Sequence, residues 1–126
     1  MRQETLSAIV DNKVKKGDVI TASKFAGIQA AKATSALLPL CHQIPLTSVE
    51  IDILPRAGRL WARCRVVAEY RTGVEMEALV GVTAALLNAW DMVKYLEKDS
   101  RGQYPDTVLS DIRVVTKEKG GAADGS

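Results

Sequence analysis

Residues 46–70, LTSVEIDILPRAGRLWARCRVVAEY, decide the fold class, because two alternating runs flank a short turn. In residues 46–54 and again in residues 60–70, apolar side chains alternate with polar or charged ones. A period of two is typical of strands with one buried face. Pro55-Arg56-Ala57-Gly58 lies between the runs and supplies a turn. We therefore predict an antiparallel hairpin.

Helices are predicted on both sides of this hairpin. Residues 19–38 carry many small side chains, which let another backbone approach closely, and Asp18 is placed to cap this helix. Residues 74–97 are rich in Ala, Leu and Met, contain no proline and predict a long helix. A short helix over 4–10 and a last strand over 108–116 complete the predicted elements.

The order helix, helix, strand, strand, helix, strand predicts an α+β domain of the ferredoxin-like class. In such a domain the helices pack on one face of an antiparallel sheet. A complete ferredoxin-like domain opens with a strand, and the sequence offers no good candidate for it. We expect one domain over 1–117 and a disordered, polar, Gly-rich tail over 118–126.

Charge and cysteine content narrow the function classes. The chain has 17 basic and 15 acidic side chains, a bias too small to indicate a nucleic-acid-binding protein. Cys41 and Cys64 match no zinc or Cys-x-x-Cys spacing, so we expect free thiols in a reducing compartment, with a disulfide left open. The longest weakly polar run, 78–90, is short for a bilayer span, and the N-terminus lacks a signal peptide's apolar stretch. We expect a cytoplasmic protein without a membrane partner.

Two polar clusters combine lysine with aspartate. Lys15-Lys16-Gly17-Asp18 lies where a loop enters a helix, so Lys16 and free backbone N–H groups could bind phosphate there. The alternative is a solvated cap with exposed lysines. Asp91 and Lys94 are three residues apart, on one face of the long helix. Partly buried, such a pair serves acid–base catalysis; exposed, it is an ordinary ion pair, and periodicity leaves both readings open.

Two further clusters have weaker signals. Leu40-Cys41-His42 lies between two prolines, which predicts a rigid loop with a polar tip. Cys41 and His42 are adjacent and do not face each other, and no other histidine is available for a metal site. Glu75-Met76-Glu77 opens the long helix, where acidic residues stabilise the helix dipole without any further role. Taken separately, no cluster identifies a function, and no P-loop or GxGxxG motif is present.

In combination the clusters resemble the MoaC family, the cyclic pyranopterin monophosphate synthases. The matching stretches follow the family's order: Lys16-Gly17-Asp18, Ala26-Gly27-Ile28-Gln29-Ala30-Ala31-Lys32, Pro39-Leu40-Cys41-His42, Thr72-Gly73-Val74-Glu75-Met76-Glu77-Ala78-Leu79 and Asp91-Met92-Val93-Lys94. The resemblance covers about residues 2–119. It implies a lyase that converts 3′,8-cyclo-7,8-dihydro-guanosine triphosphate to cyclic pyranopterin monophosphate with release of pyrophosphate, in molybdenum cofactor biosynthesis.

The resemblance also implies roles for individual residues. The implied catalytic residues are Asp91, Lys94 and Lys16. The implied substrate-binding residues are Leu40, Cys41, His42, Glu75, Met76 and Glu77. No metal ligand is implied, and any Mg²⁺ is expected to arrive with the triphosphate.

Assembly and chain length follow from the same resemblance. It implies a homohexamer, a trimer of dimers, with active sites at the dimer interface. Family members usually begin with a further segment ahead of the point where this sequence starts. That segment could supply the first strand and more phosphate contacts, so the 1–117 domain is expected to be N-terminally short.

Two other function classes compete with this interpretation. The first is a non-catalytic ferredoxin-like module that binds a nucleotide without turnover. The second is a structural oligomerisation domain, which would not need Lys16, Glu77, Asp91 and Lys94 together. Release of pyrophosphate from the cyclic dihydro-GTP separates the enzyme from both.

Overall fold

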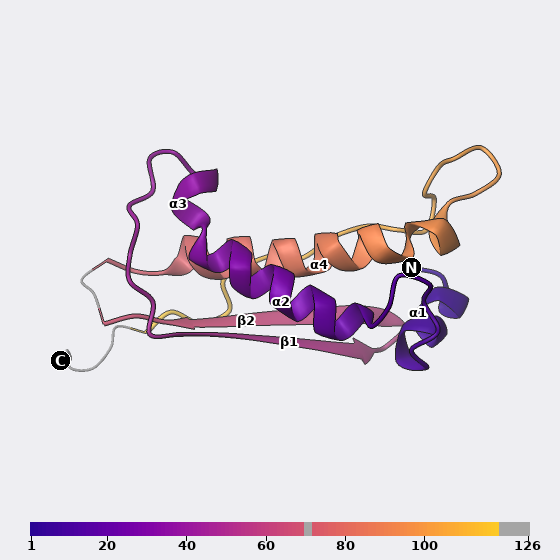
Figure 1. Ribbon diagram of the computed structural model, residues 1–126, viewed down its shortest axis with the longest axis horizontal. Helices are drawn as coiled ribbons and strands as arrows, with labels where there is room; N and C mark the ends of the chain where they lie inside the picture. Colours follow the sequence, from indigo (N-terminus) through magenta and orange to yellow (C-terminus); the bar gives the residue numbers. More distant parts are fainter. Residues whose placement is uncertain (70–71, 119–126) are drawn as a thin grey trace.

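The computed structural model describes residues 1–69 and 72–118 and has two layers (Figure 1). One layer is a hairpin of the strands β1 (Ser48–Arg56) and β2 (Arg59–Val67), and the other contains the helices α2 (Val19–Lys32) and α4 (Glu75–Glu97). The short helices α1 (Gln3–Val10) and α3 (Thr34–Leu37) lie at opposite ends of these layers. The predicted α+β class, an antiparallel sheet covered by helices, is confirmed.

The predicted hairpin is confirmed, with a tighter turn than expected. β1 and β2 pair antiparallel from Ser48–Val67 to Arg56–Arg59. Only Ala57 and Gly58 form the turn, with φ values of 52° and 74°. Two residues in the left-handed conformation match the twist of the flanking strands. Pro55 and Arg56, which were expected in the turn, therefore belong to β1. β2 ends at Val67, before the predicted end at residue 70, which lies outside the described residues.

The predicted helix over 19–38 is interrupted, which corrects the sequence-based boundary. α2 ends at Lys32, and Ala33 leaves helical geometry with φ −103° and ψ 17°. The Thr34 hydroxyl donates to the Ala31 carbonyl at 2.8 Å and so competes with continued helical bonding. α3 then adds one short turn. After α3 the chain enters the loop that carries Cys41, and this loop lies at the start of α4.

The small residues of α2 are used inside the chain, against α4. A Cβ on Gly27 would lie 2.8 Å from the Gly81 carbonyl oxygen and 3.1 Å from the Ala85 Cβ. A Cβ on Gly81 would lie 2.8 Å from the Cys64 Sγ. Glycine at both positions therefore lets the backbones of α2 and α4 approach each other closely and leaves room for the Cys64 side chain of β2 against α4.

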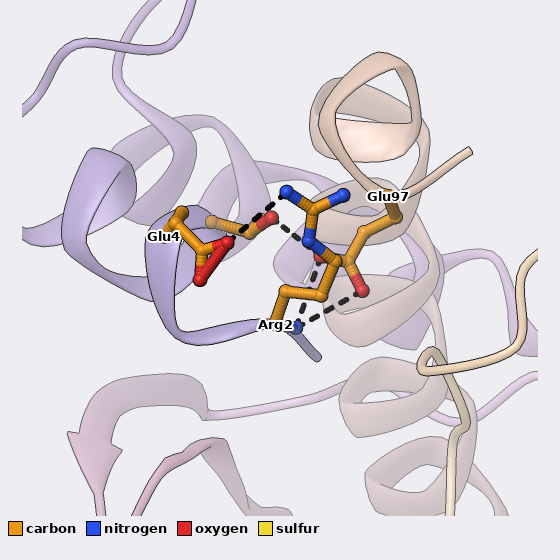
Figure 2. A network of polar contacts seen from close by, with 4 residues as sticks. Arg2, Glu4 and Glu97 are labelled. Carbon is orange, nitrogen blue, oxygen red and sulfur yellow. Dashed lines mark hydrogen bonds and ion pairs between the residues drawn. The ribbon is translucent and has the colours of Figure 1, made fainter. Parts of the chain in front are cut away.

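A buried carboxylate ties the N-terminus to the end of α4 (Figure 2). Glu97 is 1% exposed and accepts hydrogen bonds from the Arg2 backbone N–H at 3.1 Å and from the Thr107 hydroxyl at 2.6 Å. The Thr5 hydroxyl donates to it as well. Burial raises the pKa of Glu97, but these hydrogen bonds outweigh burial and hold the pKa below its ordinary value. The Arg2 guanidinium turns instead to Glu4, at 3.1 Å.

We expect Glu97→Gln to destabilise the fold by about 2 kcal/mol at pH 7, because an amide replaces a charged acceptor of several hydrogen bonds. A lowered folded-state pKa stabilises the fold above the unfolded-state pKa, and this stability is lost as the pH falls through the folded-state pKa. The parent should therefore lose stability below about pH 4, and the Gln variant should lose less. Urea unfolding at pH 7 and pH 3 measures both effects. An equal loss in the two proteins would contradict this role.

The predicted strand over 108–116 is wrong for the described residues. This segment is irregular and forms no strand ladder, because β2 pairs with β1 alone in the described part of the chain. Its ends are held at the two ends of α4, by the Thr107–Glu97 hydrogen bond and by Lys117 Nζ, 3.1 Å from Glu75 Oε2. The segment therefore runs antiparallel to α4. Of the expected tail over 118–126, residues 119–126 lie outside the described residues.

α4 corrects one further expectation. By length and composition it is a helix that could cross a membrane, which the sequence analysis expected of no segment. Core helices of globular proteins meet the same criterion. Gly81, Ala85 and Val93 of α4 are buried against the rest of the chain, and 33% of its most apolar stretch is buried in the described structure.

Candidate functional site

Asp91 lies between two lysines on the outer side of α4. Its Oδ1 is 2.9 Å from Lys94 Nζ, and its Oδ2 is 3.6 Å from Lys16 Nζ. The Lys16 ammonium also donates to the Asp91 backbone carbonyl at 3.4 Å. Lys16 comes from the loop between α1 and α2, so the fold brings together three residues that are up to 78 positions apart in the numbering.

The loop that carries Lys16 is fixed by its own local structure. Gly17 has a φ of 118°, a left-handed conformation that favours glycine. Asp18 then caps α2 as predicted: its Oδ1 accepts the Thr21 N–H at 3.1 Å, and its Oδ2 accepts the Thr21 hydroxyl at 2.8 Å. The cap occupies Asp18, which leaves the lysines as the cationic groups of the loop.

Tyr95 anchors the same loop from α4, a contact that the sequence analysis missed. The Lys15 backbone N–H donates to the Tyr95 hydroxyl at 2.8 Å. The Lys15 ammonium lies 5.5 Å from the centroid of the Tyr95 ring. Tyr95 follows Lys94 directly in the sequence. The same turn of α4 therefore carries Lys94 and also the side chain that holds the loop of Lys16 in place. The only feature of the sequence that could have pointed to Tyr95 is its position next to Lys94.

The cluster is charged and open to solvent. The side chains of Lys16, Asp91 and Lys94 are 49%, 56% and 45% exposed. The hydrogen bond from Lys94, followed by the charge of Lys16, lowers the pKa of Asp91. The hydrogen bond to Asp91 raises the pKa of Lys94. The sequence left open a partly buried pair and an exposed ion pair, and these exposed fractions are closer to the exposed ion pair.

This arrangement has a definite chemical capacity. Two ammonium groups about one carboxylate leave a net positive surface that attracts a polyphosphate. A protonated lysine is an acid, and an ionised aspartate is a base, within hydrogen-bonding distance of each other. The cluster can therefore hold an anion and supply or accept protons beside it.

A second group of predicted residues gathers at the start of α4. Glu77 is only 3% exposed, and its Oε2 lies 4.0 Å from the Cys41 Sγ. Its Oε1 has no hydrogen-bond partner in the described part of the chain. A buried carboxylate oxygen without a partner is costly, which indicates a site for a donor.

The other predicted binding residues are placed differently. Leu40 is 96% exposed and Met76 43% exposed, and His42 is also at the surface. Glu75 pairs with Lys117, and its pKa is lowered by a hydrogen bond from its own backbone N–H and by one from the Lys117 ammonium. Cys41 and Glu77 are therefore the pair that the fold brings together.

The two groups do not meet within one chain. Asp91 and Glu77 are 14 positions apart on the same helix, roughly 21 Å at 1.5 Å per residue. In Figure 1 the loop after α3 lies at the start of α4, and the loop before α2 lies at its other end. One chain therefore carries two separate candidate groups, which are called half-sites below.

Residues 1–69 and 72–118 contain no group of three or more His, Cys, Asp or Glu side chains placed to hold a metal ion. Cys41 and Cys64 are both free thiols, as expected. Burial raises the pKa of the Cys64 thiol to about 11, so this cysteine is protonated and unreactive at neutral pH.

Comparison with known proteins gives a consistent answer. The model of the MoaC family matches residues 1–120. The chain is 52% identical over 119 residues to a probable cyclic pyranopterin monophosphate synthase of Saccharolobus solfataricus, covering 94% of this chain and 80% of that protein. It is 55% identical over 120 residues to a protein of the same description from Thermococcus kodakarensis, covering 95% and 77%. It is also 47% identical over 119 residues to a probable cyclic pyranopterin monophosphate synthase accessory protein of Methanothermobacter thermautotrophicus, covering 94% and 75%.

Proposed function

Because the chain belongs to the MoaC family, we infer that it is a cyclic pyranopterin monophosphate synthase, a lyase of molybdenum cofactor biosynthesis. Its substrate is the cyclic dihydro-GTP, which it rearranges to the cyclic pyranopterin monophosphate with release of pyrophosphate. The observation that carries this proposal is the carboxylate of Asp91 between the ammonium groups of Lys16 and Lys94. A reaction that rearranges rings and expels pyrophosphate needs both proton transfer and cations.

The chemistry divides among the three residues of this cluster. Opening and closing the purine-derived ring needs a base and an acid, roles that Asp91 and Lys94 can take because their carboxylate and ammonium groups lie 2.9 Å apart. In the closing step a sugar hydroxyl attacks the α-phosphorus, its proton passes to a base, and the bond from that phosphorus to the bridging oxygen breaks. Lys16 and Lys94 can stabilise the negative charge that develops on the departing pyrophosphate.

Turnover of the cyclic dihydro-GTP tests this proposal directly. We expect one pyrophosphate and one cyclic pyranopterin monophosphate per substrate consumed. Binding of the substrate without either product would reject the enzyme and favour the non-catalytic module. One relative is described as an accessory protein, so the distinction between an enzyme and a non-catalytic module has to be measured. Both would bind the substrate, and only turnover separates them.

The half-site of Cys41 and Glu77 suits the guanine-derived end of the substrate. Glu77 has a buried carboxylate oxygen with no partner, and a carboxylate can accept two hydrogen bonds from the N–H groups of a guanine-like edge. Leu40, His42 and Met76 stand at the surface around this loop, where an incoming substrate could contact them. Glu75, engaged by Lys117, supports the start of α4 from the side.

We expect Glu77→Gln to weaken substrate binding about tenfold or more, equivalent to ~1.4 kcal/mol, because an amide presents only one acceptor and adds a donor facing the substrate's donors. Calorimetric titration with the cyclic dihydro-GTP measures this. Glu50→Gln, on the exposed face of β1 and paired with Arg65, is the matched control and should leave the affinity unchanged. Unchanged affinity in Glu77→Gln would remove Glu77 from the site.

We expect Tyr95→Phe to lower kcat about fivefold and to leave KM nearly unchanged, because losing one hydrogen bond to the loop loosens the placement of Lys16. Steady-state kinetics on the single variant and on the Tyr95→Phe/Lys16→Ala double variant separates positioning from general stability. If Tyr95 acts through Lys16, the Tyr95 substitution has no further effect once Lys16 is absent. Additive losses would show that Tyr95 acts elsewhere.

A second copy of the chain completes the site in this proposal. The two half-sites are roughly 21 Å apart along α4, so a dimer that pairs the start of one α4 with the end of the other would bring them together. Three such dimers give the expected homohexamer. The half-site separation supports a dimer; the trimer of dimers follows from the family alone.

The remaining features of the proposal concern fold and surroundings. We retain the ferredoxin-like topology as a proposal, supported by the helix-covered antiparallel hairpin. Mg²⁺ is proposed to arrive with the triphosphate, since phosphate oxygens are its usual ligands. Two free thiols support a reducing, cytoplasmic location. The near-balanced charge supports a small-molecule partner rather than nucleic acid or a membrane surface.

A further inference from the structure

One row of side chains at the end of α4 runs through Lys94. Trp90 precedes Lys94 by four residues, and Lys98, directly after the last residue of α4, follows it by four. Residues at this spacing are neighbours on one face of a helix. The stem of Lys94 therefore lies between the side chains of Trp90 and Lys98.

The ring of Tyr104 reaches this row from the loop that follows α4. Its centroid is 5.6 Å from the centroid of the Trp90 ring, and the two planes are inclined at 66°, an edge-to-face contact. The Lys98 ammonium lies 5.9 Å from the centroid of the same Tyr104 ring. A ring that contacts the residues one turn before and one turn after Lys94 lies beside the stem of Lys94.

The electrostatics of Lys94 agree with this placement. The hydrogen bond to Asp91 and the charge of Asp91 raise the pKa of Lys94, partial burial opposes them, and the Tyr104 phenol adds a smaller contribution that raises the pKa. The phenol is thus within electrostatic range of the ammonium group. Because the Lys94 side chain remains 45% exposed, Tyr104 covers the stem and leaves the ammonium accessible.

The loop that carries Tyr104 is fixed by its own hydrogen bonds. Asp99 Oδ1 accepts the backbone N–H groups of Arg101 and Gln103, both at 2.8 Å. The Asp99 N–H donates to the Gln103 carbonyl at 2.8 Å. In Figure 1 the loop leaves the end of α4 and returns to it, where the Thr107 hydroxyl is bonded to the helix again. Tyr104 is therefore placed against α4 by an ordered loop.

A catalytic lysine needs such support because its stem is flexible. Several rotatable bonds separate the Lys94 ammonium from the backbone, and holding the group in one place costs rotamer entropy. A ring beside the stem excludes the rotamers that would swing the ammonium away from Asp91. The reactive geometry is then populated before the substrate binds.

We propose that Tyr104 is a positioning residue for Lys94: its ring, supported by Trp90, holds the stem so that the ammonium stays at the Asp91 carboxylate. Tyr104 acts through Lys94, and no contact with the substrate is assigned to it. The inference rests on the proposed function for the catalytic use of Lys94. The Lys98 contact locates the ring, but a cation–π contact of an exposed lysine is weak and the proposal does not need it.

Labelling of amines with acetic anhydride, without substrate, tests whether Tyr104 holds Lys94. Only the neutral amine reacts, and the ion pair with Asp91 keeps Lys94 protonated. We expect Tyr104→Ala to raise the labelling rate of Lys94 about threefold, because a stem freed from the ring leaves Asp91 and regains an ordinary pKa. Peptide mass spectrometry measures this rate against that of Lys13, an exposed lysine of the loop between α1 and α2.

Two control variants accompany this measurement. Tyr104→Phe keeps the ring and should label close to the parent rate. Gln103→Ala changes the neighbouring side chain of the same loop, whose amide bonds only to the Arg101 carbonyl at 3.5 Å, and should match the parent. An unchanged labelling rate of Lys94 in Tyr104→Ala would overturn the proposal.

Steady-state turnover of the cyclic dihydro-GTP tests the consequence for activity. We expect Tyr104→Ala to lower kcat about tenfold and Tyr104→Phe to retain nearly all of it, because the ring holds the stem. In the Lys94→Ala background, Tyr104→Ala should cause no further loss. A merely structural role predicts a different result, namely a loss of activity and of thermal stability in both backgrounds.

The two measurements fail separately. A parent chain without turnover would reject the proposed function, and the labelling would still decide whether Tyr104 holds Lys94. An active parent with faster labelling of Lys94 but an unchanged kcat in Tyr104→Ala would overturn the positioning role. If Tyr104→Ala does not fold, Trp90→Leu removes the support of the ring and should produce both changes to a smaller degree. Neither change in a folded Trp90→Leu variant would overturn the proposal as well.

Discussion

Lys94→Ala should lower kcat/KM by about 10²–10⁴-fold, the usual contribution of a general acid, while the protein remains folded. Lys94 is half-exposed and touches Asp91 through its ammonium group, so its removal opens no cavity. In the proposed mechanism it removes a proton donor and one of the two cations that stabilise the departing pyrophosphate. Pyrophosphate release from the cyclic dihydro-GTP measures the loss, and thermal unfolding checks the fold.

Two matched variants separate the possible causes of that loss. Lys98→Ala removes a lysine one helix turn further on, whose ammonium lies 5.9 Å from the Tyr104 ring, and should cost little activity. Lys94→Arg keeps the charge but cannot release its proton at neutral pH, so it should restore substrate binding more than turnover. Full turnover with arginine would show that Lys94 acts through charge alone. An equal loss in Lys98→Ala would show a general need for positive charge.

Local pattern predicted those parts of the fold that local interactions determine. The alternation in 46–54 fixed the buried face of β1, where Ile51 and Ile53 are 6% and 4% exposed. Asp18 caps α2 through Thr21, three residues away, which is a sequence-local signal. The break at Ala33 was missed because nothing in the composition of 19–38 forbids a longer helix. The strand over 108–116 failed because strand pairing depends on a neighbour, not on the pattern.

The candidate site divides in the same way. Asp91 and Lys94 could be paired from their spacing on one helix turn, and the structure places their charged atoms 2.9 Å apart. Lys16 reaches Asp91 only through the fold, since 75 positions separate them. For Glu77, position in a first helix turn indicated an exposed residue near the dipole. An exposed position near the helix dipole describes Glu75 better than Glu77. Glu77 instead faces Cys41 and the interior of the protein.

Mixing two impaired variants should restore activity at substrate concentrations below KM, where both are slow, if the site is shared between subunits. Lys94→Ala damages the half-site at the end of α4, and Glu77→Gln damages the half-site at its start. In a mixed dimer one composite site receives both defects, and the other receives neither. After random reassociation of equal amounts, about a quarter of all sites are intact, so about a quarter of the parent activity should return.

A second mixture supplies the control, because it uses two variants of the same half-site. Lys94→Ala mixed with Asp91→Asn should remain inactive, since Asp91 and Lys94 come from one turn of one α4 and every site retains a defect. Restoration by Glu77→Gln but not by Asp91→Asn therefore requires that Glu77 and Lys94 act on one substrate from different chains. If neither mixture recovers activity although subunits exchange, each chain holds its own complete site. The separation of roughly 21 Å along α4 would then have to be bridged within the monomer, by the substrate or by a movement of the Cys41 loop.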